Sequence, residues 1–553
     1  MQKLKRLLQK DIPAPAFWTL AVCVMLAKAV LGYYQCTYVW VGGAPLDDEL
    51  MWRAAQSISA GQWLGDYDCL TLSKQMFFAV WLALCNKLGV PYLVAGQLLV
   101  CGAALAMALA FRPVLIKRWQ QWLLFAALAC SPAAGASFTL RVYRDNIFPA
   151  LCVLFFAGLI GCALRYRRGL RHYWLWLVLA GVGFGLAKIT REDGIWLLPF
   201  GLAATVITCI YILREKGLDK KLLRCAAQLL PYGFMAAAVL VVSALNYTHY
   251  GVFATSDFSE GSFAAAYGAM TRIEHEEEKN LIPVPTDVRA KLYDAVPRLQ
   301  PVLRLLEEDP NLQNSYRNPV LDDYMAGSFY WVLRQAAQME GIYETAQTAE
   351  VYWQQVADEI NAAIDGGQLT AAHGKRSSTT PIIRGYHVLP TIAETLRSVV
   401  YCATFRDCLC YYPDQLSLIT PQDEAIWSAY LGSHSNYAAQ PYTDIPSYSG
   451  LQMLVYKLFN LFIPLYAVLV PLLLAVAAVR QVGSALAMIR TKNADGLLLW
   501  LILLGVLAMA LLRCAMIAFM EVAAFNIGTY VMYLSTVHPL LITFAVAGSV
   551  RQN

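Results

Sequence analysis

Charged residues are scarce in this chain. Asp, Glu, Lys and Arg together make up 15% of the 553 residues, whereas apolar residues make up 58%. Soluble proteins carry roughly 25% charged and 45–50% apolar residues. The composition therefore excludes a soluble globular protein and indicates a chain that crosses a membrane several times. The net charge of +5 comes from basic residues clustered between apolar runs, which argues against nucleic-acid binding.

The motifs of several common chemistries are also missing. There is no Walker A sequence for ATP, the seven histidines include no HExxH spacing, and no internal repeat is evident. The glycines of GVGFG, at 181–185, lie inside an apolar run, where close helix packing explains them. Most of the 14 cysteines also lie in apolar runs. The cysteines that could reach an oxidising compartment are Cys69, Cys402, Cys408 and Cys410, and the last three could form one disulfide.

Apolar runs of about 20 residues predict ten transmembrane helices. They are expected at 17–40, 92–111, 121–138, 147–164, 173–190, 195–213, 225–245, 455–479, 496–513 and 528–549. The first run follows MQKLKRLLQK and lacks the small-residue cleavage site of a signal peptide, so it is predicted to be an uncleaved span. The run at 75–88 is short for a crossing and is predicted to be an interfacial or re-entrant helix.

The basic clusters then fix the topology. If 75–88 does not cross, every cluster from the N-terminus to Arg551 falls on one side, which the positive-inside rule makes cytoplasmic. Both termini are therefore predicted to be cytoplasmic, as are Arg167 and Lys220, whereas Met270 and Cys402 face outside. This gives a transmembrane catalytic module at 1–245, with outer loops at 41–74 and 139–146, an extracytoplasmic domain at 246–452 and C-terminal spans at 453–553.

The 246–452 segment is polar and mostly helical in pattern. Apolar residues recur every three or four positions, as in Trp353, Val356, Ile360 and Ile364, and again in Ile392, Leu396, Val399 and Ala403. This periodicity predicts a small, mostly helical extracytoplasmic domain.

The first outer loop begins with three acidic residues, Asp47, Asp48 and Glu49. They precede a helix whose apolar stripe, Leu50, Met51, Ala54, Ala55 and Ile58, is expected to lie flat in lipid. One carboxylate would be enough to cap that helix. Three clustered carboxylates raise each other's proton affinity, which suits a general base or a cation site. Capping and function both stay open at this point.

Basic residues are predicted at the same outer face. Arg141, Arg144 and Asp145 end the third predicted span, and Lys188, Arg191, Glu192 and Asp193 lie between spans five and six, while Lys74 opens the 75–88 helix. A purely structural interpretation is that these side chains extend toward the membrane interface and form ion pairs with one another. Arginines on the outer face are nevertheless disfavoured unless an anion meets them, and phosphate is the anion that Arg binds in bidentate fashion.

With these residues in place, the chain resembles the GT-C superfamily of polyprenyl-phosphate-sugar-dependent glycosyltransferases, which includes protein O-mannosyltransferases and the aminoarabinose transferase of lipid A. The resemblance covers about 15–215. It rests on the acidic pair of the first outer loop, the run GQWLGDYDCLTLSK, the charged second loop and the corner at 190–194. The chain departs from some members by lacking Lys-Pro-Pro near Lys74, and it has Tyr530 and Tyr533 where many have Arg-Tyr.

The resemblance implies an all-α polytopic membrane protein, a GT-C-like bundle of about ten transmembrane helices with juxtamembrane helices and a mostly helical extracytoplasmic domain. It also implies an inverting glycosyltransferase that moves a sugar from a polyprenyl-phosphate donor in the bilayer to a glycan, lipid or protein acceptor of the cell envelope. The expected base is Asp48, shared with Asp47. The residues expected to bind the donor phosphate are Lys74, Arg141, Arg144 and Arg191. The residues expected to support the acceptor are Glu49, Asp145, Glu192 and Asp193.

Three points stay open in the sequence. The acidic loop could also hold a divalent cation. A lipid-linked saccharide transporter or flippase would use buried charges such as Lys188 without chemistry. A surface-polysaccharide polymerase or ligase would suit the large outer segment equally well.

Overall fold

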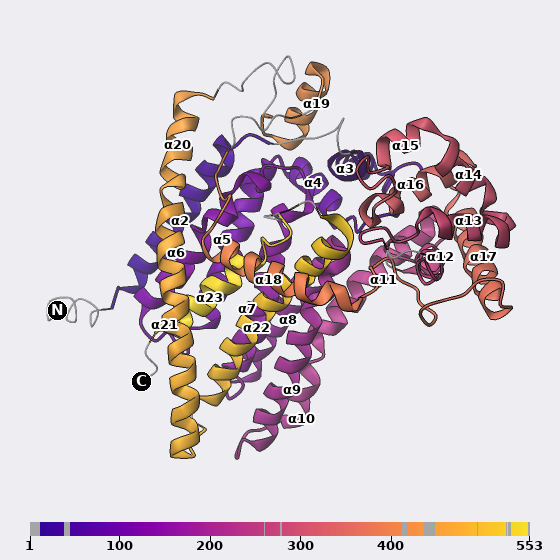
Figure 1. Ribbon diagram of the computed structural model, residues 1–553. Coiled ribbons are helices and arrows are strands. Elements are labelled where there is room, and N and C mark those ends of the chain that lie inside the picture. Colours follow the sequence, from indigo (N-terminus) through magenta and orange to yellow (C-terminus); the bar gives the residue numbers. More distant parts are fainter. Residues whose placement is uncertain are drawn as a thin grey trace.

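The computed structural model describes residues 11–37, 45–258, 260–276, 279–411, 417, 419–435, 448–494, 496–526, 528 and 532–550. Within these ranges the regular structure is helical, and extended backbone pairs only in isolated bridges. The all-α prediction is confirmed. In Figure 1, long helices form a bundle, and a group of shorter helices lies beside one end of it.

Eight described helical segments are long and apolar enough to cross a membrane, and they match eight of the ten predicted spans. Four are single helices or a helix with a short leading turn: α2 (Ala14–Tyr34), α5 (Tyr92–Ala110), η4 with α7 (Arg144–Asn146, Phe148–Ala163) and α8 (Leu170–Thr190). The others are η5 with α9 (Glu192–Leu197, Leu198–Arg214), α10 with α11 (Lys221–Ala227, Leu230–Tyr250), α20 with α21 (Gly450–Asn460, Phe462–Thr491) and α22 with η8 (Leu497–Met520, Glu521–Phe525). The chain is a multi-pass membrane protein.

The remaining two predicted spans are not continuous long helices. The run at 121–138 forms α6 (Arg118–Ala129), followed by the short turns η2 (Pro132–Gly135) and η3 (Ser137–Thr139) after a bend of 47°. Pro132 lacks a backbone N–H and disfavours a helical residue before it, so the helix ends there. The run at 528–549 contains only α23 (Val537–Ser549) as a described helix, and 529–531 lie outside the described residues.

The two predicted short helices of the first outer loop are present. They are α3 (Leu50–Ser59), which follows the wide turn η1 (Pro45–Glu49), and α4 (Phe77–Leu88). The expected lipid contact of α3 is wrong, because Met51, Ala54 and Ala55 are buried and α3 packs on α4. The stripe is covered by a protein neighbour that amphipathicity alone does not identify.

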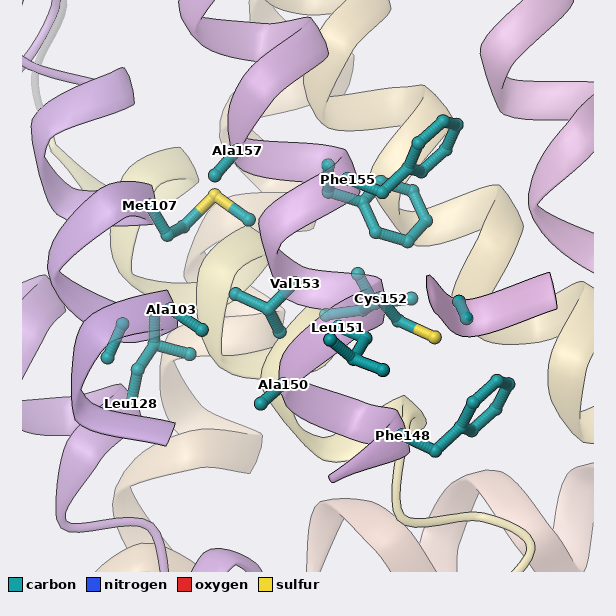
Figure 2. Close-up of a cluster of buried hydrophobic side chains, with 14 of the residues drawn as sticks. Ala103, Met107, Leu128, Phe148, Ala150, Leu151, Cys152, Val153, Phe155 and Ala157 are labelled. Atoms are coloured by element: carbon teal, nitrogen blue, oxygen red, sulfur yellow. The ribbon is translucent and has the colours of Figure 1, made fainter. Parts of the chain in front are cut away.

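The core of the bundle lies around α7, which packs against α5 and α8. Figure 2 shows Met107 of α5 beside Val153 and Ala157 of α7, with Phe155 on another side of α7. Gly183 of the GVGFG stretch brings α8 close to α7, since a Cβ there would stand 2.6 Å from the Phe155 backbone nitrogen, whereas Gly181 and Gly185 face α11. These glycines serve helix packing, as the sequence indicates.

A second hydrophobic core is built by the shorter helices. It contains Trp353, Val356 and Ile360, which the sequence pattern places on one helix face. The elements are α12 (Gly261–Thr271), α13 (Thr286–Ala295), η6 (Pro297–Leu299), α14 (Gln300–Glu308), α15 (Pro310–Tyr316), α16 (Ala326–Met339) and α17 (Ala346–Asp365).

The later part of 246–452 packs differently. After η7 (Gly385–His387), α18 (Val388–Ala403) contacts α22 of the bundle, and the α19 helix (Pro421–Leu431) stacks Trp427 on Trp52 of α3 at a ring separation of 4.1 Å. Cys402 and Cys408 belong to the core of the bundle and not to that of α12–α17. All 14 cysteines are free. Because Met270 and Cys402 are fully buried, neither is a useful position for accessibility labelling.

Candidate active site

The predicted outer-face charges meet at one end of the bundle. Short turns bring them together: η1 carries the acidic pair, η4 follows the broken α6, and η5 follows α8. Because these turns replace regular helix, neighbouring polar side chains can point at one centre instead of being spread around a helix axis. Ten residues form what we call the charge network: Asp47, Asp48, Lys74, Arg141, Arg144, Asp145, Arg191, Glu192, Asp193 and Arg513.

The two aspartates of η1 have different surroundings. The Asp48 carboxylate is fully buried and accepts a hydrogen bond of 2.7 Å from Arg141 Nε. The Asp47 carboxylate keeps 30% of its side-chain surface exposed and pairs with Lys74 and with Arg141 Nη2, the latter at 3.0 Å. Partial burial opposes ionisation of Asp47, but the charges of Lys74 and Arg141 outweigh it and hold the pKa of this carboxyl well below its usual range. Asp47 is thus an accessible carboxylate that is ionised at neutral pH.

Tyr143 joins the loops at 41–74 and 139–146. Its hydroxyl accepts hydrogen bonds from Lys74 Nζ at 3.1 Å and from Arg144 Nη2 at 2.7 Å. The centre of the Arg141 guanidinium lies 4.9 Å from the same ring, within cation–π range. Burial raises the pKa of Tyr143 above its ordinary value, so the hydroxyl remains protonated. Lys74 also lies 5.1 Å from the Trp331 ring, which places α16 over the site.

The remaining arginines are held by carboxylates. Arg144 Nη1 donates to both Glu192 oxygens at 2.8 Å, and the backbone N–H of Gln75 donates to the same carboxylate. Arg191 pairs with Asp145 at 2.9 Å and with Asp193 at 3.0 Å.

A further arginine of the site comes from a membrane span. Arg513 of α22 donates to Asp193 Oδ2 at 2.6 Å and is almost fully buried. Arg513 is not among the site residues that the sequence predicts. The signal was a single charge inside the apolar run of α22, since ionisable residues inside spans usually have a function or a partner.

Within the described residues, the charge network contains five carboxylates and five cations. The balance follows from burial, because a buried charge without a partner costs several kcal/mol. The sequence predicts that these arginines need an anionic partner. In the structure, the carboxylates of the network supply that partner without a bound phosphate. Two buried donors, Arg144 Nε and Arg513 Nη2, have no hydrogen-bond partner among the described residues.

Of the predicted site residues, Glu49 is the one that lies apart from the network, because it pairs with Arg53 one turn along α3. Lys188 is also separate and pairs with Glu260 at 3.4 Å. In the sequence, Tyr533 only marks a departure from the pattern that the chain resembles, yet its ring lies 4.9 Å from the Arg191 guanidinium. The described residues contain no group of three His, Cys, Asp or Glu placed to hold a metal ion.

A cavity of about 50 Å³ adjoins the network at Asp145. Its walls are apolar on α5 and α7, whereas four polar atoms on its lining have no partner among the described residues: Ser131 Oγ, Asn146 Oδ1, Ser535 Oγ and His538 Nδ1. Unpartnered buried polar atoms of this kind are commonly satisfied by water. The site thus combines an accessible carboxylate, clustered cations and a polar recess.

Comparisons with known proteins return no matching family model and no matching curated protein. Two solved structures are similar to this chain, both of ArnT from Cupriavidus metallidurans, one in the apo state and one bound to undecaprenyl phosphate. Each is 14% identical over 97% of this chain and 78% of the other, with TM-scores of 0.32 and 0.30.

Proposed function

We propose that this protein is an inverting glycosyltransferase that moves a sugar from a polyprenyl-phosphate donor to a cell-envelope acceptor at the extracytoplasmic face. The observation that carries the proposal is the charge network at one end of a membrane bundle, with Asp47 as its partly exposed carboxylate. Such a site offers a proton acceptor beside cations that can stabilise a departing phosphate.

In the proposed reaction, the acceptor hydroxyl oxygen attacks the anomeric carbon as its proton passes to a carboxylate. The bond between that carbon and the phosphate oxygen breaks, and polyprenyl phosphate leaves with the electron pair. Asp47 is better placed than Asp48 to take the proton, because the Asp48 side chain is fully buried. Asp48 instead positions Arg141.

Lys74, Arg141, Arg144 and Arg191 are the proposed phosphate-facing cations. The donor phosphate would compete with Asp47 for Lys74 and Arg141, which hold the pKa of Asp47 low. Loss of these ion pairs raises the proton affinity of Asp47. Donor binding and activation of the base are thereby coupled. The carboxylates Asp145, Glu192 and Asp193 keep the other cations in position.

A transporter is the alternative, and one observation favours it. Lys28 of α2 is buried inside a span, lies 5.5 Å from the Phe459 ring and has no carboxylate partner among the described residues. Intramembrane cations of this kind occur along transport paths. The buried cations of the charge network, in contrast, lie together at one end of the bundle and are paired with carboxylates. This arrangement favours a catalytic site over a transport path.

The test is a deletion strain of the source organism complemented with the wild-type or the Asp47→Asn chain. Mass spectrometry of the surface glycans and the lipid extract should show a missing sugar and an accumulated polyprenyl-phosphate sugar in the deletion strain. Wild-type protein should restore the sugar to the surface glycans and remove the accumulated donor. Asp47→Asn should do neither. A donor that accumulates only on the cytoplasmic leaflet would support the transporter instead.

A further inference from the structure

The α18 helix exposes an apolar face. Five large aliphatic residues on it are exposed by 48% to 77%: Val388, Leu389, Ile392, Leu396 and Val400. Their spacing of three and four residues places them on one side of the helix. The sequence pattern predicts Ile392 and Leu396 as part of a domain core, so their exposure is a correction. A contiguous apolar face of this kind marks contact with a partner or a membrane.

The opposite face of α18 is buried against membrane spans. The Cys402 thiol contacts that of Cys514 on α22. Cys514 precedes the end of α22 at Met520 by six residues, which corresponds to about 9 Å along the helix. The last turn of α18 therefore lies inside the end of this span, at the level of Arg513, which precedes Cys514 and belongs to the charge network.

The chain after α18 stays at a similar depth. The Phe405 ring is 5.2 Å from that of Tyr466, in the apolar helix α21, and Cys410 packs with Leu31 of α2. Leu31 lies three residues inside the end of α2 at Tyr34, or about 4.5 Å. Three separate spans thus place 402–410 within the bundle rather than above it.

The neighbours of α18 show what surrounds it at this depth. It contacts α22 and η8, the turn at the end of the same span, together with α23, α21 and the adjacent η7, and Figure 1 shows it lying across α22. The spans α21 and α22 expose their own aliphatic side chains, including Leu472 and Leu504. In a multi-pass protein these surfaces face lipid, and α18 packs on the same two spans with its own apolar face exposed. Its charged pair, Glu394 and Arg397, lies beside the stripe, and Arg397 can extend toward the polar interface.

We propose that α18 is embedded in the membrane leaflet nearest the charge network, with Val388, Leu389, Ile392, Leu396 and Val400 in contact with acyl chains. Residues 388–410 then form a re-entrant amphipathic segment that braces α22 next to Arg513. This placement is independent of the proposed activity, since it rests on packing and exposure alone.

Photocrosslinking tests the placement. The full chain carries p-benzoylphenylalanine at Leu396 and is reconstituted in nanodiscs of phosphatidylcholine with radiolabelled acyl chains. Val351 is the matched control, because it is also aliphatic and 56% exposed but lies on α17 of the second core. Leu504 of α22 is the positive control. Leu396 should label lipid about as well as Leu504 and at least several-fold more than Val351.

Labelling of Leu396 no higher than that of Val351 would overturn the proposal, as would crosslinking to a second copy of the chain. Hydroxyl-radical footprinting of the wild-type protein in the same nanodiscs gives an independent answer if a variant fails to fold. Leu389, Ile392 and Leu396 should be protected from oxidation while Val351 is oxidised, and equal oxidation of all four would contradict lipid burial.

Discussion

The two ends of the helical bundle bury arginines in different ways. At the end with the basic clusters, Arg165 donates to the backbone carbonyls of Leu109, Ala110 and Gly161 at 2.6–3.0 Å. At the other end, Arg144 and Arg191 bind side-chain carboxylates. Carbonyls at a helix end need a donor whatever the protein does, so Arg165 has a structural explanation. Asp48 and Asp145 of the charge network are themselves fully buried ions, and helix packing alone does not require them.

The two kinds of arginine site differ in what they can do. An arginine on a carbonyl replaces a missing backbone hydrogen bond, whereas several ion pairs in contact create a site whose charges can be rearranged by an anionic ligand. The following predictions test whether the two ends respond differently to loss of one cation.

The largest effect is expected from Arg191→Ala. The change leaves the Asp145 carboxylate, 1% exposed, without its partner, and breaking a buried pair costs roughly 3–5 kcal/mol. We expect a large fall in thermal stability in detergent together with loss of sugar transfer. The double variant Arg191→Ala/Asp145→Asn should regain much of the stability without regaining transfer. Equal stability of the single and double variants would show that the pair is not buried in the membrane-bound protein.

A loss of about 10²-fold or more in transfer rate is expected from Arg144→Ala, if this residue stabilises the departing phosphate. Its control is Arg167→Ala at the opposite end, where the side chain is 68% exposed and pairs with Glu215. That variant should transfer sugar at the wild-type rate. Near-normal rates for both variants would remove the phosphate role and leave interfacial anchoring as the explanation.

A change in stability without a change in rate is expected from Arg165→Met. The substitution leaves carbonyls at the end of α5 without their donor, which costs about 1–3 kcal/mol. Thermal unfolding should shift downward, while the rate per folded molecule stays the same. A large fall in that rate would mean that the end with the basic clusters also takes part in the chemistry.

The smallest effect is expected in the pH dependence of stability. The folded-state pKa of Asp47 lies below its unfolded value, so its ionised form contributes stability above the unfolded value of about 3.9 and loses it as pH falls toward the folded value. Thermal unfolding measured from about pH 6 down to about pH 3 should therefore decline less steeply for Asp47→Asn than for the wild type. The same decline of thermal stability with pH in both proteins would contradict the ion pairs of Asp47 with Lys74 and Arg141.

Much of the fold could be predicted from hydropathy, because eight spans leave long apolar runs in the sequence. The broken α6 and the submerged α18 could not be predicted in this way. In the first, Pro132 interrupts an apolar run, and in the second the same amphipathic pattern fits either a protein core or a lipid surface. Periodicity gives the apolar face of a helix but not the neighbour that covers it.

The site was predicted in part for a similar reason. Clustered charges such as Asp47 and Arg144 stand out in an apolar sequence, but the pairing of each cation with a carboxylate depends on distances between loops. Tyr143 carries no charge and Arg513 lies far along the chain, so neither was found. The relative exposure of Asp47 and Asp48, adjacent in sequence, also needed the structure.

We propose that the charge network is a catalytic site with a first-loop carboxylate as its base. The most direct measurement is transfer of labelled sugar by purified protein in nanodiscs, with donor lipid and envelope acceptor both prepared from the deletion strain. Asn cannot accept the proton but has nearly the same shape as Asp. Asp47→Asn should lose transfer per folded molecule and lose only the stability that its ion pairs with Lys74 and Arg141 contribute near neutral pH. Glu49→Gln, outside the network, should transfer normally. Wild-type transfer by Asp47→Asn, Asp48→Asn and the double variant would contradict the account.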